Sequence, residues 1–508
     1  MQLYHAYDMS AGEPMSTPVL AGMVVLLSGF ALLGIWAGRR GVRSVEDLIT
    51  ARDSIGPRQL TATLVASVMG VWILFAAPEA GAGFGVAAVI GYAVGQAIPM
   101  ALYARIGPRI RELLPMGHSL PEYVRVRYGS GAYLLILGVS AMYMFIFVAA
   151  ELTGIAGAFA AVAGIAPLQT VLIVGGAVLI YTAYGGLRAS ILTDSIQALL
   201  ILPLLALVTL AVLLRVGAVV PPGSVQAELI PASVGFWAGA QFGLALVFAI
   251  VGAELINQTW WQRIYAGADG PTVRRSFRSA MVLNGAITFI AAGLGVVSRA
   301  SAPIVTDVTT AGYNADAALF ILVDTLVPGL SLAVLFLALM LVISSMDSLF
   351  NALASLLTTD IGRVLPAVAP GTLTRVARVV TVVVAIGAMY VSLRAQSVLR
   401  LFFLADLLGA AVAVPMLAGL YSDRIDERGV LLASGLGLVV GLAYFPDLRW
   451  LLVQLPVVGS LLPPADPLYL RAFAGAMLSS AAVTVAAVGL SRSRVDLRQL
   501  RDRVHPLE

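Results

Sequence analysis

Long apolar runs follow one another along almost the whole chain, and short polar segments separate them. Most runs hold about 18 or more residues, the length that an apolar helix needs to cross the hydrocarbon core of a bilayer. The pattern therefore predicts an all-α polytopic membrane protein with about 13 transmembrane helices. The predicted spans are residues 18–38, 58–79, 84–105, 131–162, 168–185, 189–214, 236–258, 277–299, 329–360, 374–394, 397–421, 429–445 and 468–490.

The composition agrees with lipid as the main solvent of the chain. Of its 508 residues 60% are hydrophobic and 11% are charged, whereas soluble proteins carry about 25% charged residues. The chain has no cysteine, which excludes disulfides, iron–sulfur clusters and thiolate nucleophiles. The three histidines, His5, His118 and His505, lie outside the apolar runs, so chemistry inside the membrane cannot rest on imidazole.

The basic residues are all arginines, and they flank the predicted spans. Arg39, Arg40 and Arg43 follow the first span and no basic segment precedes it, so we expect a membrane helix with its N-terminus outside, not a signal peptide. On this orientation the C-terminus is cytoplasmic. Of 31 arginines, six lie on the opposite side: Arg215, Arg299, Arg394, Arg400, Arg449 and Arg471. This charge pattern indicates multi-pass insertion in the cell (inner) membrane and no nucleic-acid partner.

The order of the spans predicts an internal symmetry. Without the first span and the last two, ten remain in two sets of five, residues 58–217 and 236–421. Because five is odd, the second set crosses the membrane in the opposite sense, which is the inverted repeat common in transporters. The expected flanking parts are an extracellular N-terminus, first helix and cytoplasmic loop (1–57), two C-terminal helices (429–490) and a solvated or interfacial cytoplasmic tail (491–508).

The first helix of each set contains a glycine where it could break. Gly70 lies near the middle of residues 66–78, and Gly252 precedes a charged residue in residues 248–258. Glycine inside a helix costs about 1 kcal/mol relative to alanine, and helices broken at matching places in two repeats indicate a midplane binding site. The alternative is that glycine is simply frequent in membrane helices, since the chain has 50.

Two polar stripes stand out on apolar helices. Ser190, Thr193, Asp194 and Gln197 share one face of the helix in GGLRASILTDSIQALL (185–200). An ionised aspartate at the bilayer centre costs about 2.5–3.5 kcal/mol unless it faces a cavity or finds a partner. The second stripe comprises Ser344, Asp347, Ser348, Asn351 and Ser355, with Ser345 beside it.

Hydroxyls and carboxylates together suit a small hard cation, because such ions prefer oxygen ligands. We therefore expect the two stripes to meet and form one cation site. The alternative is that the serines bond to their own helix carbonyls and that an arginine pairs with the aspartates.

Several segments resemble the sodium:solute symporter family. GGLRASILTDSIQ (185–197), NQTWWQR (257–263) and SSMDSLFNALASLLTTDI (344–361) are similar to its signature segments in order and spacing, and residues 49–67 resemble its first cytoplasmic loop. The resemblance extends over about 40–425. It implies a LeuT-like core of two inverted five-helix repeats. It also implies secondary active transport, with sodium-coupled symport of a small polar organic solute into the cell by alternating access.

The resemblance also implies a sodium site between core helices 1 and 8. Its ligands would be the backbone carbonyls of Ala66, Met69 and Leu341 and the hydroxyls of Ser344 and Ser345. Sodium is accordingly the expected coupling ion and the only expected metal.

Some family members bind a second sodium, and the matching positions here include Asp194, Asp347 and Ser348 besides Ser344. Asp347 replaces what is often a small hydroxyl residue. Because like charges resist joint ionisation, one of the two aspartates could instead hold a proton. The number of coupled ions and proton coupling therefore stay open. Val68 stands where proline-transporting members carry an acid, which argues against proline as the solute.

Solute selection is expected at the two helix breaks. The candidate residues are Gly70, Val71, Trp72, Phe75, Ala253, Glu254 and Asn257. Glu151 and Asp406 are further intramembrane acids, although Glu254 could instead pair with an arginine or hydroxyl, and Asp406 could bond to a neighbouring helix. Trp260 and Trp261 are expected to be interfacial anchors.

Other functions compete with sodium symport. Proton-coupled symport and a solute-binding membrane sensor on a transporter fold are the main alternatives, and a passive channel would not need two acid-and-hydroxyl stripes. An enzyme is not expected, because no nucleophile or metal constellation emerges. PMGHSLPEYVRVRYG (115–129) resembles a urea-transporting branch, but it is a loop and does not identify the solute. We expect the chain to function as a monomer in the lipid bilayer.

Overall fold

The computed structural model is a bundle of membrane-length helices. It describes residues 16–41, 49–301, 315–327, 329–364, 370–395, 397–491 and 494–504. Ten helices in this part of the chain are long and apolar enough to cross a membrane, and a bent pair makes up to eleven. Two shorter apolar helices, Pro167–Ile180 and Val379–Ser392, cover the two remaining predicted spans. Each predicted span thus lies on an apolar helix, because a chain in lipid must satisfy its backbone hydrogen bonds internally.

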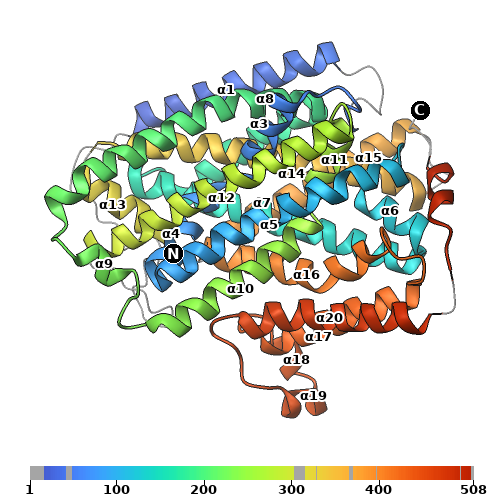
Figure 1. Ribbon diagram of the computed structural model, residues 1–508. Coiled ribbons are helices and arrows are strands. Elements are labelled where there is room, and N and C mark those ends of the chain that lie inside the picture. The colour runs from blue at the N-terminus through green and yellow to red at the C-terminus, as the bar shows by residue number, and fades with distance from the viewer. Residues whose placement is uncertain are drawn as a thin grey trace.

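The long helices make up the bundle, and short helices occupy its breaks and connections (Figure 1). The long ones are α1 (Ser16–Gly41), α5 (Val86–Leu113), α7 (Ser130–Ala163), α8 (Pro167–Val219), α10 (Gly235–Leu255), α12 (Gly270–Ser301), α14 (Ser331–Val364), α15 (Pro370–Ser392), α16 (Val398–Ala418), α17 (Glu427–Tyr444) and α20 (Leu470–Leu490). The short ones are α3 (Pro57–Val68), η2 (Val71–Ile73), α4 (Ala76–Phe84), α6 (Leu120–Arg127), α9 (Ser224–Glu228), α11 (Gln258–Ala266), η3 (Ala315–Ala317), α13 (Ala318–Leu326), α18 (Trp450–Val453), α19 (Pro456–Leu461) and η4 (Leu497–Asp502).

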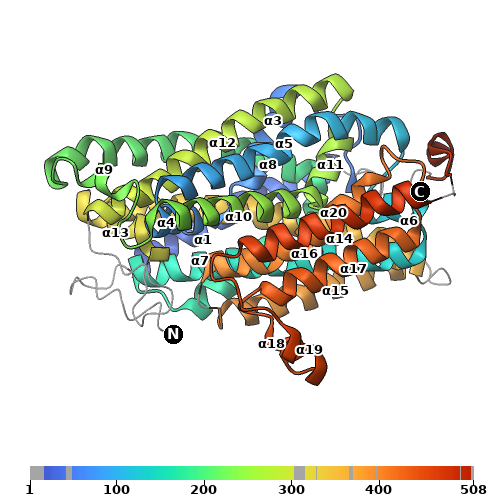
Figure 2. The ribbon, with the colours of Figure 1, turned by 60° about the horizontal axis from the view of Figure 1, so that its bottom comes forward.

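Helix α14 lies at the centre of the bundle. In its most apolar stretch 83% of the residues are buried, against 28% in the peripheral α1. It contacts α3, α7, α8 and α15, whereas α1 lies along α8 at one edge, and α17 and α20 lie at the other (Figures 1 and 2). The helix that carries the second polar stripe is therefore shielded from lipid, which is where its serines and aspartate can be satisfied.

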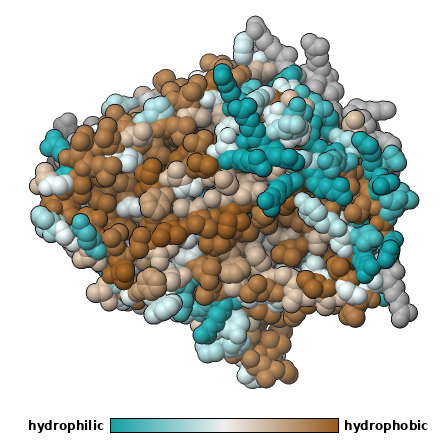
Figure 3. Space-filling model, viewed as in Figure 1, coloured by the Kyte–Doolittle hydropathy of each residue, from teal (hydrophilic) through white to brown (hydrophobic). Residues whose placement is uncertain are grey.

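One end of the bundle is polar and most of its visible side is apolar (Figure 3). The polar end holds α6 and α11 (Figures 1 and 2). This separation fits a molecule that stands in a bilayer with its arginines gathered on one side.

The sharpest turn inside a long helix occurs at Gly186. Its φ of 63° and ψ of −177° interrupt α8 and separate the fourth and fifth core helices. A φ in this range is strained for any residue with a Cβ atom, so glycine suits the position. The predicted boundary between the spans 168–185 and 189–214 falls here.

Both predicted helix breaks exist, but one lies elsewhere than expected. The first core helix bends by 68° between α3 and the segment Val71–Phe84, at Met69 and Gly70 as predicted. In the second repeat α10 continues through Gly252 to Leu255, and the break comes at Ile256 and Asn257. Gly252 instead allows close packing, since a Cβ atom there would overlap the backbone of Ala410 on α16.

The segment after this break also differs from expectation. With predicted spans at 236–258 and 277–299, residues 259–276 are predicted to lie between two spans, outside the membrane. Instead α11 continues the broken helix, and all nine of its residues are buried. Hydropathy missed this because α11 carries glutamines and an arginine that find partners inside the protein.

The C-terminal tail lies against the bundle through a few residues, while most of its described residues are exposed. Leu500 and Val504 are buried, and Arg503 Nη1 donates to the carbonyl of Val126 at 3.2 Å. Residues 505–508, and residues 1–15 at the other terminus, lie outside the described residues.

Gly252→Ala tests the close packing of α10 on α16. The added methyl group has no room beside Ala410, so we expect a loss of about 1–3 kcal/mol in the free energy of unfolding. Thermal unfolding in detergent measures it. Gly138→Ala on α7 is the control, because nothing lies within 4 Å of a Cβ atom there. Equal melting temperatures for both variants would contradict the packing argument.

Candidate functional site

Asp194 is the centre of a buried polar cluster between four helices. Thr63 Oγ1 and Ser67 Oγ, one turn apart on α3, donate to Asp194 Oδ2 at 2.6 and 2.9 Å. Ser344 Oγ on α14 donates to Asp194 Oδ1 at 2.6 Å. The first polar stripe on α8 thus meets the second on α14, and α3 adds two hydroxyls.

Arg263 on α11 reaches into the same cluster. Its Nη2 atom lies 3.1 Å from Asp194 Oδ2 and donates to Ser67 Oγ at 3.0 Å and to Ser348 Oγ at 2.8 Å. Both charged side chains are fully buried. A guanidinium therefore stands beside Asp194 and Ser348, where the resemblance implied a second metal cation. The structure thus has the arrangement that the sequence analysis gave as the alternative to a cation site, an arginine paired with an aspartate.

The guanidinium is only partly satisfied. Nε and Nη1 of Arg263 are buried without a hydrogen-bond partner among the described residues. A buried ion pair is stabilising only when both its charges and its remaining donors are satisfied. Removing one of the two partners lowers the free energy of unfolding by about 3–5 kcal/mol. The pair therefore holds the cluster together and has two donors that could take other partners when α11 moves.

Asp347 has a separate set of partners. Thr182 Oγ1 and Asn351 Nδ2 donate to Asp347 Oδ1 at 2.7 and 3.0 Å, and Thr193 Oγ1 lies 3.4 Å from Oδ2. These donors are neutral. Asp347 is thus held by hydroxyls and an amide, while its neighbour Ser348 on α14 contacts Arg263 of the charged pair.

The residues of the implied sodium site lie where α3 ends beside α14. Ala66, Met69, Leu341, Ser344 and Ser345 are all buried. A helix end leaves the carbonyls of its last turn without amide partners inside the helix, and such carbonyls suit a cation. Ser345 Oγ donates to the carbonyl of Val342 at 3.3 Å, a long bond that a cation could replace. The sodium ligands stay a prediction.

Glu151 supports the break in the first core helix. Its Oε2 atom accepts from the backbone amide of Val71 at 2.8 Å, and a Cβ atom on Gly70 would overlap its carboxylate. Gly70 therefore belongs at the break because the acid approaches the backbone closely. Val71 takes part through its amide, while Phe75 packs against Phe320 with ring centroids 5.1 Å apart.

Glu254 bridges the break in the second repeat. Its Oε2 atom accepts from Trp260 Nε1 at 2.6 Å and from Asn257 Nδ2 at 3.2 Å. Asn257 Oδ1 in turn accepts from the amide of Thr259 and caps α11. Glu254 therefore pairs with an indole and an amide, and with neither the arginine nor the hydroxyl that the sequence suggested.

Trp260 and Trp261 are not interfacial anchors. Both are 0% exposed, and Trp261 stacks on Tyr123 of α6 with ring centroids 5.7 Å apart. Paired tryptophans near a span end favour an interfacial position on average, but here α11 turns inward and buries both.

A small cavity lies between the two breaks. It measures about 20 Å³, and its wall contains two carboxylates and no basic side chain. The wall is formed by Ser67, Val68, Trp72, Phe147, Glu151, Glu254, Asn257, Thr259, Ser345 and Leu349. Of the predicted solute residues Trp72, Glu254 and Asn257 line it, whereas Gly70, Val71, Phe75 and Ala253 do not. A cavity of this size holds about one water, so this state is closed around its centre.

Asp406 on α16 lies behind the cavity. It is 5% exposed and interacts electrostatically with Glu254, and it has no hydrogen-bond partner among the described residues. The bond to a neighbouring helix that the sequence suggested is therefore not formed in this part of the chain.

Sequence reasoning missed Arg263, Thr63, Ser67 and Thr182. Thr63 and Ser67 carry a readable signal, since hydroxyls four residues apart share one face of the first core helix. Arg263 carries a weaker one. It follows the Asn257 break by six residues, and a charged residue so close to a break could have been assigned to the interior.

Comparison with known proteins identifies related transporters. The model of the sodium:solute symporter family matches residues 48–437. The spermidine transporter DUR31 of Candida albicans is 25% identical over 409 residues, which cover 79% of this chain and 75% of that protein. The sodium/proline symporter of Escherichia coli is 30% identical over 212 residues, which cover 40% of this chain and 41% of that one.

Solved structures show the same fold. A Na⁺-coupled sialic acid symporter in a substrate-bound outward-open state has a TM-score of 0.72 at 18% identity, covering 94% of this chain and 99% of that one. Mhp1, a nucleobase-cation-symport-1 family transporter, has a TM-score of 0.55 at 16% identity, covering 90% and 98%. The predicted fold class, an all-α membrane protein with a LeuT-like core, is confirmed by these likenesses.

The pair formed by Asp194 and Arg263 can be tested by a double-mutant cycle. Arg263→Gln alone leaves a buried uncompensated carboxylate, so we expect a loss of about 3–5 kcal/mol in the free energy of unfolding. Asp194→Asn with Arg263→Gln removes both charges and should recover most of that loss. Thermal unfolding of the four proteins in sodium-free buffer gives the coupling energy. Additive losses would show that the two charges do not interact.

Proposed function

This chain belongs to the sodium:solute symporter family, and from that premise we propose that it carries a small cationic nitrogenous solute into the cell together with sodium. Family membership makes it a secondary transporter and not an enzyme. The observation that carries the proposal is the cavity between the helix breaks, whose wall holds Glu151 and Glu254 and no basic side chain.

The charge balance of the interior supports a cationic solute. Among the described residues of the membrane helices, six acids are buried: Glu79, Glu151, Asp194, Glu254, Asp347 and Asp406. The buried base among them is Arg263. In a medium of low dielectric constant such an excess of carboxyl groups attracts cations, whether protons, metal ions or amines.

The relatives agree with a nitrogenous solute. DUR31, similar over 79% of this chain, is named a spermidine transporter, and a urea–proton symporter of rice is 26% identical over 198 residues. Urea is neutral and would not need two carboxylates beside it. An amine of the spermidine type could use both acids, because two of its three ammonium groups can each pair with one carboxylate.

We place the coupling sodium at the end of α3 against α14, on the carbonyls of Ala66, Met69 and Leu341 and the hydroxyls of Ser344 and Ser345. The ion would join the broken helix to the central one and so bias the relative position of the two. Coupling then amounts to a difference in sodium affinity between conformations, since an ion shifts an equilibrium only by its preference for one state.

Arg263 argues for one transported sodium. Its guanidinium already supplies the positive charge beside Asp194 and Ser348, so a second metal ion would have to displace it.

Proton coupling is the second candidate, and one observation favours it. Asp347 is buried among neutral donors, and such a carboxyl group can accept a proton without losing an ion pair. A proton on Asp347 would replace sodium as the coupling ion while the solute site stays the same.

The orientation is inferred from the arginines. We propose a monomer in the cell (inner) membrane, with the N-terminus outside and the polar end of the bundle in the cytoplasm (Figure 3). The solute site then lies midway between the two faces. Because the cavity holds about one water, α3, α10 and the segments beyond their breaks must separate before a solute can enter.

Uptake into proteoliposomes tests the coupling ion. With an inward sodium gradient we expect accumulation of labelled spermidine that collapses when choline replaces sodium. Ser345→Ala should raise the sodium concentration for half-maximal uptake about tenfold, the effect of losing about 1.4 kcal/mol of ion binding. Ser195→Ala is the control, because that hydroxyl donates to its own helix at Ile191. Uptake that follows a proton gradient in choline would favour the second candidate.

Glu254→Gln tests the charge of the solute. Removing the carboxylate should abolish or strongly reduce uptake of spermidine, because a desolvated ammonium group loses its counter-charge. Glu112→Gln, at an exposed acid, should leave uptake unchanged. Urea, proline and a monocarboxylate complete the panel. Wild-type accumulation of urea but not of spermidine would show that the solute is neutral.

A further inference from the structure

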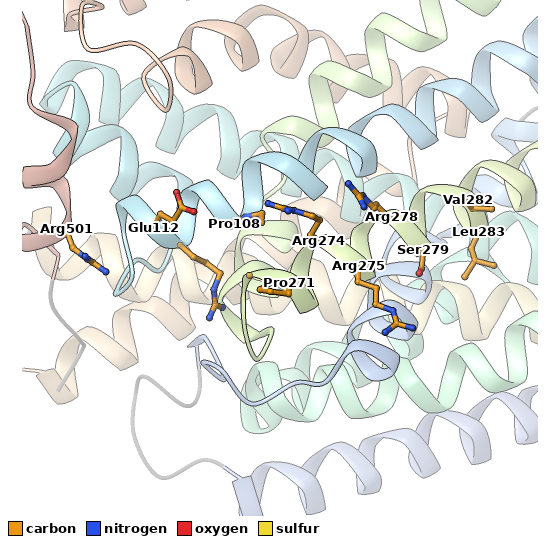
Figure 4. A pocket seen from close by; sticks show the side chains of 12 residues that line it. Pro108, Glu112, Pro271, Arg274, Arg275, Arg278, Ser279, Val282, Leu283 and Arg501 are labelled. Atoms are coloured by element: carbon orange, nitrogen blue, oxygen red, sulfur yellow. The ribbon is translucent and has the colours of Figure 1, made fainter.

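A large cavity opens at the polar end of the bundle, away from the solute site. It measures about 1000 Å³ and lies between the end of α5, the start of α12 and η4 (Figure 4). Arginine dominates its wall, with one acid, Glu112, among the lining residues. The arginines are Arg111, Arg274, Arg275, Arg278 and Arg501.

Four of these arginines have no protein partner within the part of the chain that the structure describes. The guanidinium groups of Arg274, Arg275, Arg278 and Arg501 make no hydrogen bond or ion pair there, and all four residues are exposed. Arg111 differs, because its Nη1 atom donates to the carbonyl groups of Ile264 and Gly267 at 2.9 and 2.7 Å. Arg111 thus fixes the end of α11, and the other four leave strong positive charge uncompensated.

The arginines come from two elements. Arg274 and Arg278 lie one turn apart on α12, Arg275 extends in another direction, and Arg501 stands apart on η4 beside Glu112 (Figure 4). Neighbouring guanidinium groups such as those of Arg274 and Arg278 suit phosphate oxygens, which they bind through short charge-assisted hydrogen bonds.

The same cavity has an apolar part. Val282 and Leu283 line it one turn beyond Arg278, and they are 62% and 39% exposed. The exposed apolar surface of α12 continues to Phe289 and Ile290. The cavity therefore crosses the border between the polar end and the lipid-facing side of the bundle. A soluble anion would make no use of that apolar part.

We propose that this cavity binds an anionic glycerophospholipid, with its phosphate at Arg274 and Arg278 and its acyl chains along Val282 and Leu283. Basic pockets between membrane helices are a recurrent form of lipid-headgroup site. The other arginines of the wall would add to the positive potential that attracts the anionic headgroup.

Lipid titration of the purified full-length protein in detergent tests this site. Native mass spectrometry and thermal unfolding would compare phosphatidylglycerol with phosphatidylcholine of the same acyl chains. We expect retention of phosphatidylglycerol and a raised melting temperature, and neither effect with phosphatidylcholine. The triple variant Arg274→Gln, Arg275→Gln, Arg278→Gln should lower the affinity for phosphatidylglycerol at least tenfold.

A charge-matched control distinguishes specific lipid binding in the cavity from non-specific attraction of the lipid to positive charge. Arg424→Gln, Arg428→Gln, Arg498→Gln removes as much charge from exposed arginines outside the cavity and should keep wild-type lipid affinity. Should the first triple variant not fold, Arg278→Gln alone replaces it. Equal losses in both triple variants, equal binding of phosphatidylcholine, or full competition by inorganic phosphate would each overturn the proposal.

Discussion

The core depends on one buried carboxylate. Asp194 receives hydrogen bonds from α3 and α14 and an ion pair from α11, while it stands itself on α8. Four helices that are distant in sequence thus meet at two oxygen atoms. Because Asp194 and Arg263 are fully buried, their contacts are stronger than they would be in water, and losing one leaves a charge or a hydroxyl unsatisfied. The relative position of the four helices follows from that constraint.

The two broken helices leave backbone groups that need hydrogen-bond partners, and other acids provide those partners. A helix that ends inside the membrane leaves backbone amides or carbonyls without partners, and lipid offers none. Glu151 accepts the amide of Val71 at one break, and Glu254 with Asn257 stabilises the other. These acids therefore support the breaks and also give the cavity its charge. A solute that binds there competes with the contacts that hold the breaks, which links solute binding to movement of the helices.

The sequence was sufficient for the spans, the Gly70 break and the two polar stripes, because lipid and backbone hydrogen bonding restrict those features strongly. It was not sufficient for α11. Hydropathy and the positive-inside rule assign an arginine near a span end to the aqueous side, and only the fold reveals that Arg263 turns inward to Asp194. Gly252 shows a similar limit. A glycine in a helix marks either a break or a close contact, and the choice depends on the partner helix, here Ala410 of α16.

The balance of charge connects the coupling ion to the solute. Near the breaks lie Glu151, Glu254 and Asp406, while the one buried arginine described in the membrane helices is engaged by Asp194. A closed interior with several ionised acids and one arginine would be strongly unfavourable, so cations or protons must neutralise it whenever the cavity is shut. In the proposed mechanism a cationic solute and a sodium ion would supply that charge together, each neutralising part of the excess negative charge. Closure would then be favoured only when both are bound, which would couple ion and solute without direct contact between them.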